Sequence, residues 1–175
     1  MSLHESEVIL DYSVKDVFSI FAKTAKRDFP GFNEKDPIGA TVTKQVGAYS
    51  SKTGTMTVEI TDYIKNEVYE IRSNNSSGSL VYISRYEFTA LDENKTKLVL
   101  IESEGANGIF STVNVFMTKY LFKKRIKRRF DYFVKSLENE LQALMDRRNG
   151  TNRKSANTEV DTEEVVVDKE EMTEE

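Results

Sequence analysis

The sequence contains no cysteine and only one histidine, His4, among its 175 residues. Without cysteine the chain can form neither a disulfide framework nor a thiolate metal site. His4 lies near the first residue, where fraying is common, so a Ser-His-Asp arrangement would depend on a poorly fixed imidazole. The composition therefore predicts no metal, no cofactor and no histidine-based catalysis.

Long apolar runs are missing as well. No segment reaches the roughly 18–20 consecutive apolar residues of a membrane-spanning helix. The opening "MSLHESEVILDY" also lacks the basic residues and apolar core of a secretory signal. From these absences we expect a cytoplasmic location.

Apolar residues make up only 38% of the chain, and they are scarcest at its C-terminal end. Residues 150–175 contain three basic and nine acidic residues, a net charge of −6. The whole chain carries −4, so residues 1–149 carry about +2. An acidic segment of this kind cannot bury enough surface to offset its ordering entropy. The sequence predicts one folded domain at 1–149 and a disordered acidic tail at 150–175.

Between residues 39 and 104 the pattern is that of β-strands separated by short turns. Polar and apolar residues alternate, and connections of a few residues permit only antiparallel pairing with one solvated face. A further strand is expected at 5–12. The five later strands are expected at 39–49, 55–64, 68–73, 79–91 and 96–104.

Two segments have the spacing of helices. Ser13 is an N-cap candidate for a helix whose apolar face runs from Val14 to Ala25 and which ends at Pro30. Residues 109–148 contain neither proline nor glycine and predict one long helix. Its apolar residues lie within about 100° of arc, as in a core-facing stripe. The stripe comprises Val115, Phe122, Ile126, Phe130, Phe133, Leu137, Leu141 and Leu144. The predicted fold class is α+β, with an antiparallel sheet of about six strands curled round this helix.

This order of elements resembles the helix-grip superfamily (SRPBCC), which includes START lipid-transfer domains and birch-pollen-allergen-like proteins. The stretches "ILDYSVKDVFSIFAK" (9–23) and "YEFTALDENKTKLVLIESEG" (86–105) carry the likeness, which covers roughly residues 4–147. Small bacterial members of unknown function are the most similar. The resemblance implies a cavity between the sheet and the long helix, where many relatives hold an apolar or amphipathic molecule.

Strand alternation indicates which side chains face that cavity. Tyr82 and Tyr86 are the most informative, because a buried phenol needs a hydrogen-bond partner and two of them could present hydroxyls to a ligand or to backbone carbonyls. Glu102 points inward only if Leu98 and Leu100 do, and the apolar Val99 and Ile101 leave that register open. The cavity candidates are Met56, Val58, Ile60, Tyr69, Tyr82, Tyr86, Glu102, Phe122 and Ile126.

The segment "FKKRIKRRF" places Lys or Arg at six of the seven positions from 123 to 129. Ile126 lies in the core stripe, so the cations fan over the solvated face, and we expect no specific nucleic-acid binding. Upstream, a second apolar arc is either buried on both sides or exposed beside cations. If exposed, it would contact a protein partner, a second copy of the chain, or weakly an anionic membrane. The residues of this possible interaction surface are Met117, Leu121, Lys124 and Arg128.

Three functions follow from these patterns. The first is non-catalytic binding of a small apolar or amphipathic molecule by a monomer or homodimer. The second is an interaction module or peripheral membrane module that uses the outer face of the long helix. The third is an enzyme that uses Glu102 with Tyr82 or Tyr86.

Overall fold

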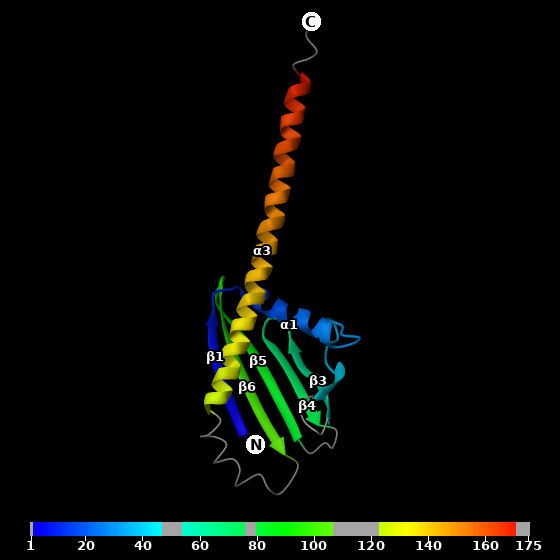
Figure 1. Ribbon diagram of the computed structural model, residues 1–175, viewed down its shortest axis with the longest axis vertical. Coiled ribbons are helices and arrows are strands. Elements are labelled where there is room, and N and C mark those ends of the chain that lie inside the picture. Colours follow the sequence, from blue (N-terminus) through cyan, green and yellow to red (C-terminus); the bar gives the residue numbers. More distant parts are fainter. Residues whose placement is uncertain (1, 47–53, 76–79, 107–122, 171–175) are drawn as a thin grey trace. The chain divides into compact units, whose positions relative to one another are not determined.

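The computed structural model describes residues 2–46, 54–75, 80–106 and 123–170. Figure 1 shows a sheet with one helix after its first strand and one helix after its last strand. The strands are β1 (Ser2–Leu10), β2 (Thr41–Val46), β3 (Gly54–Ile64), β4 (Val68–Asn75), β5 (Leu80–Asp92) and β6 (Lys95–Ala106). The helices are α1 (Val14–Asp28) and α3 (Lys123–Glu170).

The six strands form one antiparallel sheet in the order β1-β6-β5-β4-β3-β2. Successive strands from β2 to β6 are neighbours, and β1 returns to pair with β6. This arrangement confirms the predicted α+β helix-grip fold. The register shifts between Ile60 and Asp62 in β3 and between Ala90 and Asp92 in β5, while the β1–β6 pairing is continuous.

Helix α1 begins at the predicted cap. The Ser13 side chain accepts a hydrogen bond from the Asp16 backbone N–H at 3.2 Å, and the cap residue has an extended backbone. The last turn is closed by a hydrogen bond from the Phe29 N–H to the Ala25 carbonyl, just before Pro30. The apolar side of the helix is buried, as its three-and-four spacing predicted. The buried residues are Val17, Phe18, Ile20, Phe21 and Ala25.

Helix α3 contributes to two compact units, Met1–Glu138 and Asn139–Glu175. In the first unit, Phe130 and Leu137 are buried, and the ring of Phe133 packs against Phe21 and Tyr86. These contacts confirm the core stripe for this part of the helix and place it on the inner face of the sheet. The expected helical residues 109–121 lie outside the described part of the chain.

The end of α3 differs from the prediction. The helix continues through Gly150 to Glu170 rather than stopping near Arg148. No proline follows Pro37, and a single glycine costs a helix only about 1 kcal/mol relative to alanine, so neither residue type ends it here. That residues 150–175 are dispensable for folding stays a prediction, which deletion of the segment tests. Within the described residues, no helix has the length and apolar character needed to cross a membrane.

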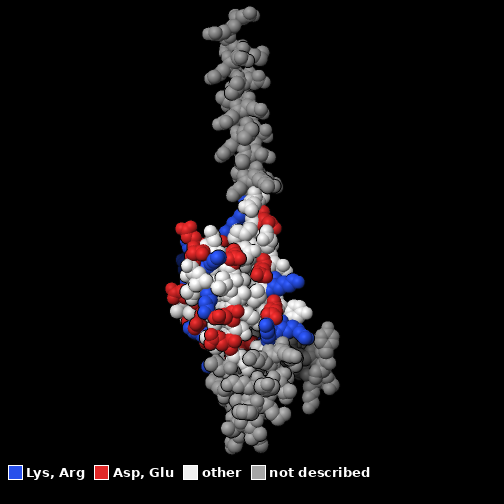
Figure 2. Space-filling model, turned by 90° about the vertical axis from the view of Figure 1, so that its left-hand side faces the viewer, with Lys and Arg blue, Asp and Glu red and all other residues white. Residues whose placement is uncertain are grey.

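The outer face of the sheet carries ion pairs. Arg85 contacts Asp62 at 2.8 Å, Glu70 at 3.1 Å and Glu87 at 2.8 Å, and these partners hold the pKa of its guanidinium above the ordinary value. From the side on which Figure 1 draws β1, acidic and basic side chains are interspersed on the coloured surface (Figure 2). On the outer face of the sheet, the ion pairs of Arg85 agree with the solvated face that strand alternation predicted.

Candidate functional site

The inner face of the sheet has an aromatic half, next to α1. Here aromatic rings from α1, β3, β4 and β5 pack against one another and against two rings of α3, with ring centroids 4.9–6.2 Å apart. Phe21 is at its centre, because its ring contacts four others, those of Tyr69, Tyr86, Phe88 and Phe133. The members of the aromatic half are Phe18, Phe21, Tyr63, Tyr69, Tyr86, Phe88, Phe130 and Phe133.

Two phenols of the aromatic half are strongly desolvated. Burial, and secondarily the negative charge of Glu102, raise the pKa of Tyr86 to about 12, while Arg129 acts in the opposite direction. Burial also raises the pKa of Tyr69, which is 6% exposed. Both phenols therefore stay protonated near neutral pH and can donate hydrogen bonds.

Further along the same strands the inner face becomes polar. Strand alternation places Ser84 and Tyr82 on the same side as Tyr86, because no register shift intervenes in β5. Ser84 lies opposite Glu102 of β6, and Glu102 lies opposite His4 of β1. Tyr82 lies opposite Ser73 of β4. The polar half of the inner face thus comprises His4, Ser73, Tyr82, Ser84 and Glu102.

One ion pair joins the polar half to α3. The guanidinium Nη2 of Arg129 donates to Oε1 of Glu102 at 2.5 Å. The Glu102 side chain is 25% exposed, so the pair lies at the margin of the interior rather than at its centre. Leu98 and Leu100 are buried, so Glu102, which follows Leu100 by two residues in the same strand, faces inward as well. This decides the orientation of β6 that the apolar residues Val99 and Ile101 had left open.

The described cations of the basic segment are exposed on α3, as predicted. Lys127 and Arg128 are exposed, as expected for a solvated helix face. Arg129 is exposed as well, and its guanidinium also pairs with Glu102 at the margin of the interior. Arg129 directly precedes the buried Phe130, so its long side chain starts at the edge of the apolar stripe and can contact the carboxylate of Glu102.

The other predicted site residues divide into four groups: buried, half-buried, outside the described residues, and exposed. Val58, Ile60 and Tyr69 are buried in the core, whereas Met56, Tyr82, Tyr86 and Ile126 are half-buried. Phe122, Met117 and Leu121 lie outside the described residues, and nothing is described of the Lys124 side chain. Arg128 is exposed. The roles predicted for all of these residues stay predictions.

Sequence reasoning missed Ser84, Ser73 and Arg129. The two serines could have been found from alternation alone, since Ser84 stands midway between Tyr82 and Tyr86 and Ser73 is two residues after Ile71. Arg129 carried no such signal, because its role depends on a contact 27 residues away in the sequence. Among the described residues, no cluster of three His, Asp or Glu side chains is placed to hold a metal ion.

A protein-family model matches residues 5–123, which is more than half of the chain. Its description is "Domain of unknown function (DUF3284)". The chain belongs to the DUF3284 family. A search of the curated proteins gave no match.

Solved structures similar to this DUF3284 protein have the same fold at low sequence identity. SA2116 from Staphylococcus aureus, a protein of unknown function, is 11% identical with a TM-score of 0.58, covering 83% of this chain and 97% of its own. Ara h 8.0201 is 12% identical with a TM-score of 0.56, covering 81% and 97%. The ZhuI aromatase/cyclase from Streptomyces sp. R1128 is 14% identical with a TM-score of 0.55, covering 80% and 93%. These likenesses establish the helix-grip fold for the DUF3284 chain.

Proposed function

We propose that the inner face of the sheet binds a small apolar or amphipathic molecule without catalysing a reaction. The aromatic half would form one wall, and the polar half would supply the hydrogen bonds that orient the molecule. Apolar sites with a few polar groups are typical of small-molecule binding. The similar solved structures include an aromatase/cyclase, so an inner face that accommodates aromatic molecules is consistent with the fold.

The observation that carries this proposal is the row of polar residues on the inner face. A sheet face that only packed against a helix would be apolar, since burying an unpaired hydroxyl or carboxylate costs free energy. Here Ser84 and Glu102 lie side by side on adjacent strands, next to Tyr86 and Tyr82. The Glu102–Arg129 pair satisfies one oxygen of the carboxylate and leaves a second oxygen able to accept a hydrogen bond.

Thermal melting of the full chain tests the proposal. We would screen fatty acids, sterols and aromatic metabolites, and native mass spectrometry of protein from its own host would reveal a retained molecule. A ligand at about 100 times its Kd stabilises the folded state by ~2.7 kcal/mol, which raises the Tm by several degrees. We expect at least one such compound.

Variants of the inner face then show where the compound binds. Tyr82→Phe should reduce the shift, because it removes a hydroxyl of the polar half, and Met56→Trp should remove it by filling the space. Tyr132→Phe is the matched control, since this tyrosine on α3 is 69% exposed. If no compound raises the Tm and Met56→Trp unfolds the protein as overpacking of a filled interior would, the proposal is wrong.

A further inference from the structure

The polar half of the inner face contains hydrogen-bonding groups that the fold itself leaves unused. Oε1 of Glu102 accepts from Nη2 of Arg129 at 2.5 Å, whereas its Oε2 has no partner among the residues that the structure describes. The hydroxyl of Ser84, opposite Glu102, and that of Tyr86, two residues further along β5, make no hydrogen bond within the same part of the chain. The unused groups are therefore one carboxylate oxygen, which only accepts, and two hydroxyls, which donate and accept.

The electric potential around these groups is set mainly by Glu102. Its side chain is 25% exposed and that of Arg129 is 66% exposed, so solvent screens the cation more than the anion. The phenol of Tyr86 responds to both charges. After burial, the charge of Glu102 is the next largest cause of its raised pKa, and it outweighs the opposite effect of Arg129. Despite the ion pair, the potential at the Tyr86 hydroxyl is therefore negative.

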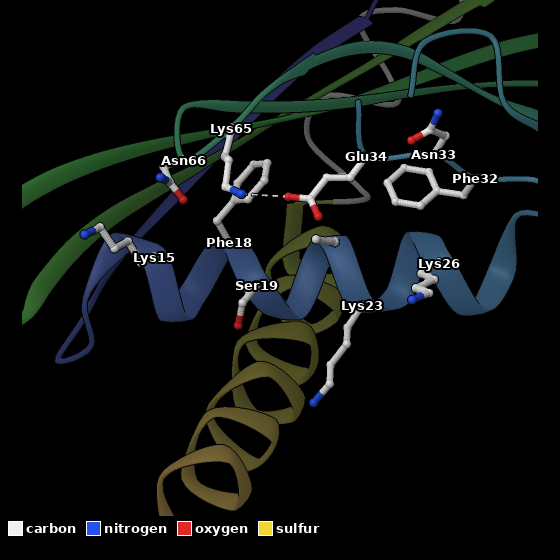
Figure 3. A pocket seen from close by; sticks show the side chains of 11 residues that line it. Lys15, Phe18, Ser19, Lys23, Lys26, Phe32, Asn33, Glu34, Lys65 and Asn66 are labelled. Carbon is white, nitrogen blue, oxygen red and sulfur yellow. Dashed lines mark hydrogen bonds and ion pairs between the residues drawn. The ribbon is translucent and has the colours of Figure 1, made fainter. Parts of the chain in front are cut away.

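The groove of about 710 Å³ beside α1 is different (Figure 3). Three lysines of α1 line it, Lys15, Lys23 and Lys26, and their side chains point to different sides. Glu34 is paired with Lys65 at 2.9 Å. The charged groups of the groove are thus either spread apart or already paired. The polar half of the inner face instead brings an acceptor and two donors together on neighbouring strands.

These groups suit a neutral hydroxyl better than a carboxylate. A hydroxyl donates to the unused oxygen of Glu102 and accepts from Ser84 or Tyr86, so every group finds a partner. A carboxylate can only accept, so it would leave Glu102 without a donor and would lose its water in a region of negative potential. An ammonium group can only donate, so it would offer no acceptor to the two O–H groups.

We propose that Glu102 selects a ligand whose inward polar end is an uncharged hydroxyl and discriminates against the matching carboxylate. The apolar body of the ligand lies against the aromatic half, and its hydroxyl lies between Glu102 and Ser84. This inference rests on the proposed function of the inner face and narrows it, since phenols and sterols fit the arrangement and fatty acids do not.

Amide chemical shifts of the 15N-labelled full chain test this selection with 2-naphthol and 2-naphthoate, which share a ring system. At pH 7 the naphthol is neutral, as phenols are, and the naphthoate is ionised, as carboxylates are. We expect naphthol to shift the amides of residues 82–88 and 98–104. Its Kd should be lower than that of naphthoate by about five-fold or more, because a hydrogen bond to a charged acceptor is gained and a like-charge contact is avoided.

Variants then show whether Glu102, rather than the greater apolarity of naphthol, causes the preference. Glu102→Gln keeps the shape and removes the charge, so the ratio of the two Kd values should fall to about two or less. Arg129→Gln, at an exposed position, leaves the negative charge uncompensated and should raise the ratio. Glu93→Gln removes one charge from the exposed β5–β6 turn and should leave the ratio at about five or more. The amide spectrum of each variant also reports whether it is folded.

The outcomes separate this inference from the function on which it rests. If naphthoate binds as tightly as naphthol, or if Glu102→Gln and Glu93→Gln give the same ratio, the inner face still binds ligands but Glu102 does not select them. If neither probe shifts the amides of β5 and β6, the proposed function fails together with this inference.

Discussion

The two halves of the inner face use their side chains differently. In the aromatic half, one ring, that of Phe21, contacts four others, and nearly every side chain is engaged in packing. In the polar half, Ser84 and Glu102 lie opposite each other on the same face of the sheet, but a hydroxyl and a carboxylate cannot pack as the rings do. Their polar atoms need hydrogen-bond partners.

If the proposed function holds, this difference separates the residues that stabilise the fold from those that select a ligand. Aromatic pairs contribute about 0.5–1.5 kcal/mol each beyond the burial of their surface, so the aromatic half holds α1, the sheet and α3 together. An ion pair at the margin of the interior contributes about 0–1 kcal/mol, so Glu102 and Arg129 can be changed at small cost. Under the proposed function, the polar half is therefore the region whose side chains can be changed to alter ligand binding while the fold is kept.

The largest effect is expected from Phe21→Ala. It removes the ring that joins α1 to β4, β5 and α3, and leaves a cavity, so the free energy of unfolding should fall by about 3–5 kcal/mol. Urea unfolding followed by circular dichroism measures this. Tyr132→Ala, at an exposed position of α3, should change it by about 0.5 kcal/mol or less. A loss below about 1 kcal/mol for Phe21→Ala would show that the aromatic half does not hold the fold together.

Alkaline pH should weaken the aromatic half next. An unfolded tyrosine ionises near pH 10, whereas folded Tyr86 keeps its proton until about pH 12. Above pH 10 the unfolded state therefore binds fewer protons, and rising pH lowers the free energy of unfolding, by up to about 3 kcal/mol from this residue alone. Tyr63 and Tyr69, whose pKa values are also raised, act in the same direction.

The measurement is urea unfolding at pH 9 and at pH 12 for the wild type and for Tyr86→Phe. The variant should lose about 2–3 kcal/mol less stability than the wild type between these two pH values. Lysine and arginine titrate equally in both proteins, so their effect cancels in the difference. Identical losses in the two proteins would mean that Tyr86 is not desolvated in the folded state.

Most of the fold could be predicted from the sequence because its signals are local. Alternation over 55–64 and 79–91 and the short connections predicted β3 and β5 and their antiparallel pairing, and Ser13 predicted the start of α1. The end of α3 could not be predicted in this way. The break expected after Arg148 depended on one glycine and on composition, and neither stops a helix that contains no proline.

The candidate site was only half predictable, for a physical reason. Tyr69 and Tyr86 follow from alternation, but the inward register of Glu102 is decided by pairing with β1 and β5, because both faces of β6 carry apolar residues. Arg129 and the lysines of α1 look alike in sequence, as solvated charges on amphipathic helices. Only the packing shows that Arg129 contacts Glu102.

The smallest effect is expected at the Glu102–Arg129 pair. Arg129 is 66% exposed and Glu102 is 25% exposed, so solvent screens their attraction. A double-mutant cycle with Glu102→Gln, Arg129→Gln and both together should give a coupling free energy of about 0.2–1 kcal/mol in urea unfolding. The same cycle can be run on the Tm shift caused by a ligand found in the screen.

If the polar half serves binding rather than stability, changes at Glu102 should affect the ligand-induced Tm shift strongly and the free energy of unfolding of the free protein only slightly. Glu102→Gln keeps the shape of the side chain but removes its charge, so it should halve the Tm shift or more while costing the free protein about 1 kcal/mol or less. A coupling above about 2 kcal/mol in the free protein would instead make the pair a structural element that holds α3 on the sheet. In that case the contrast between a stabilising aromatic half and a variable polar half would be wrong.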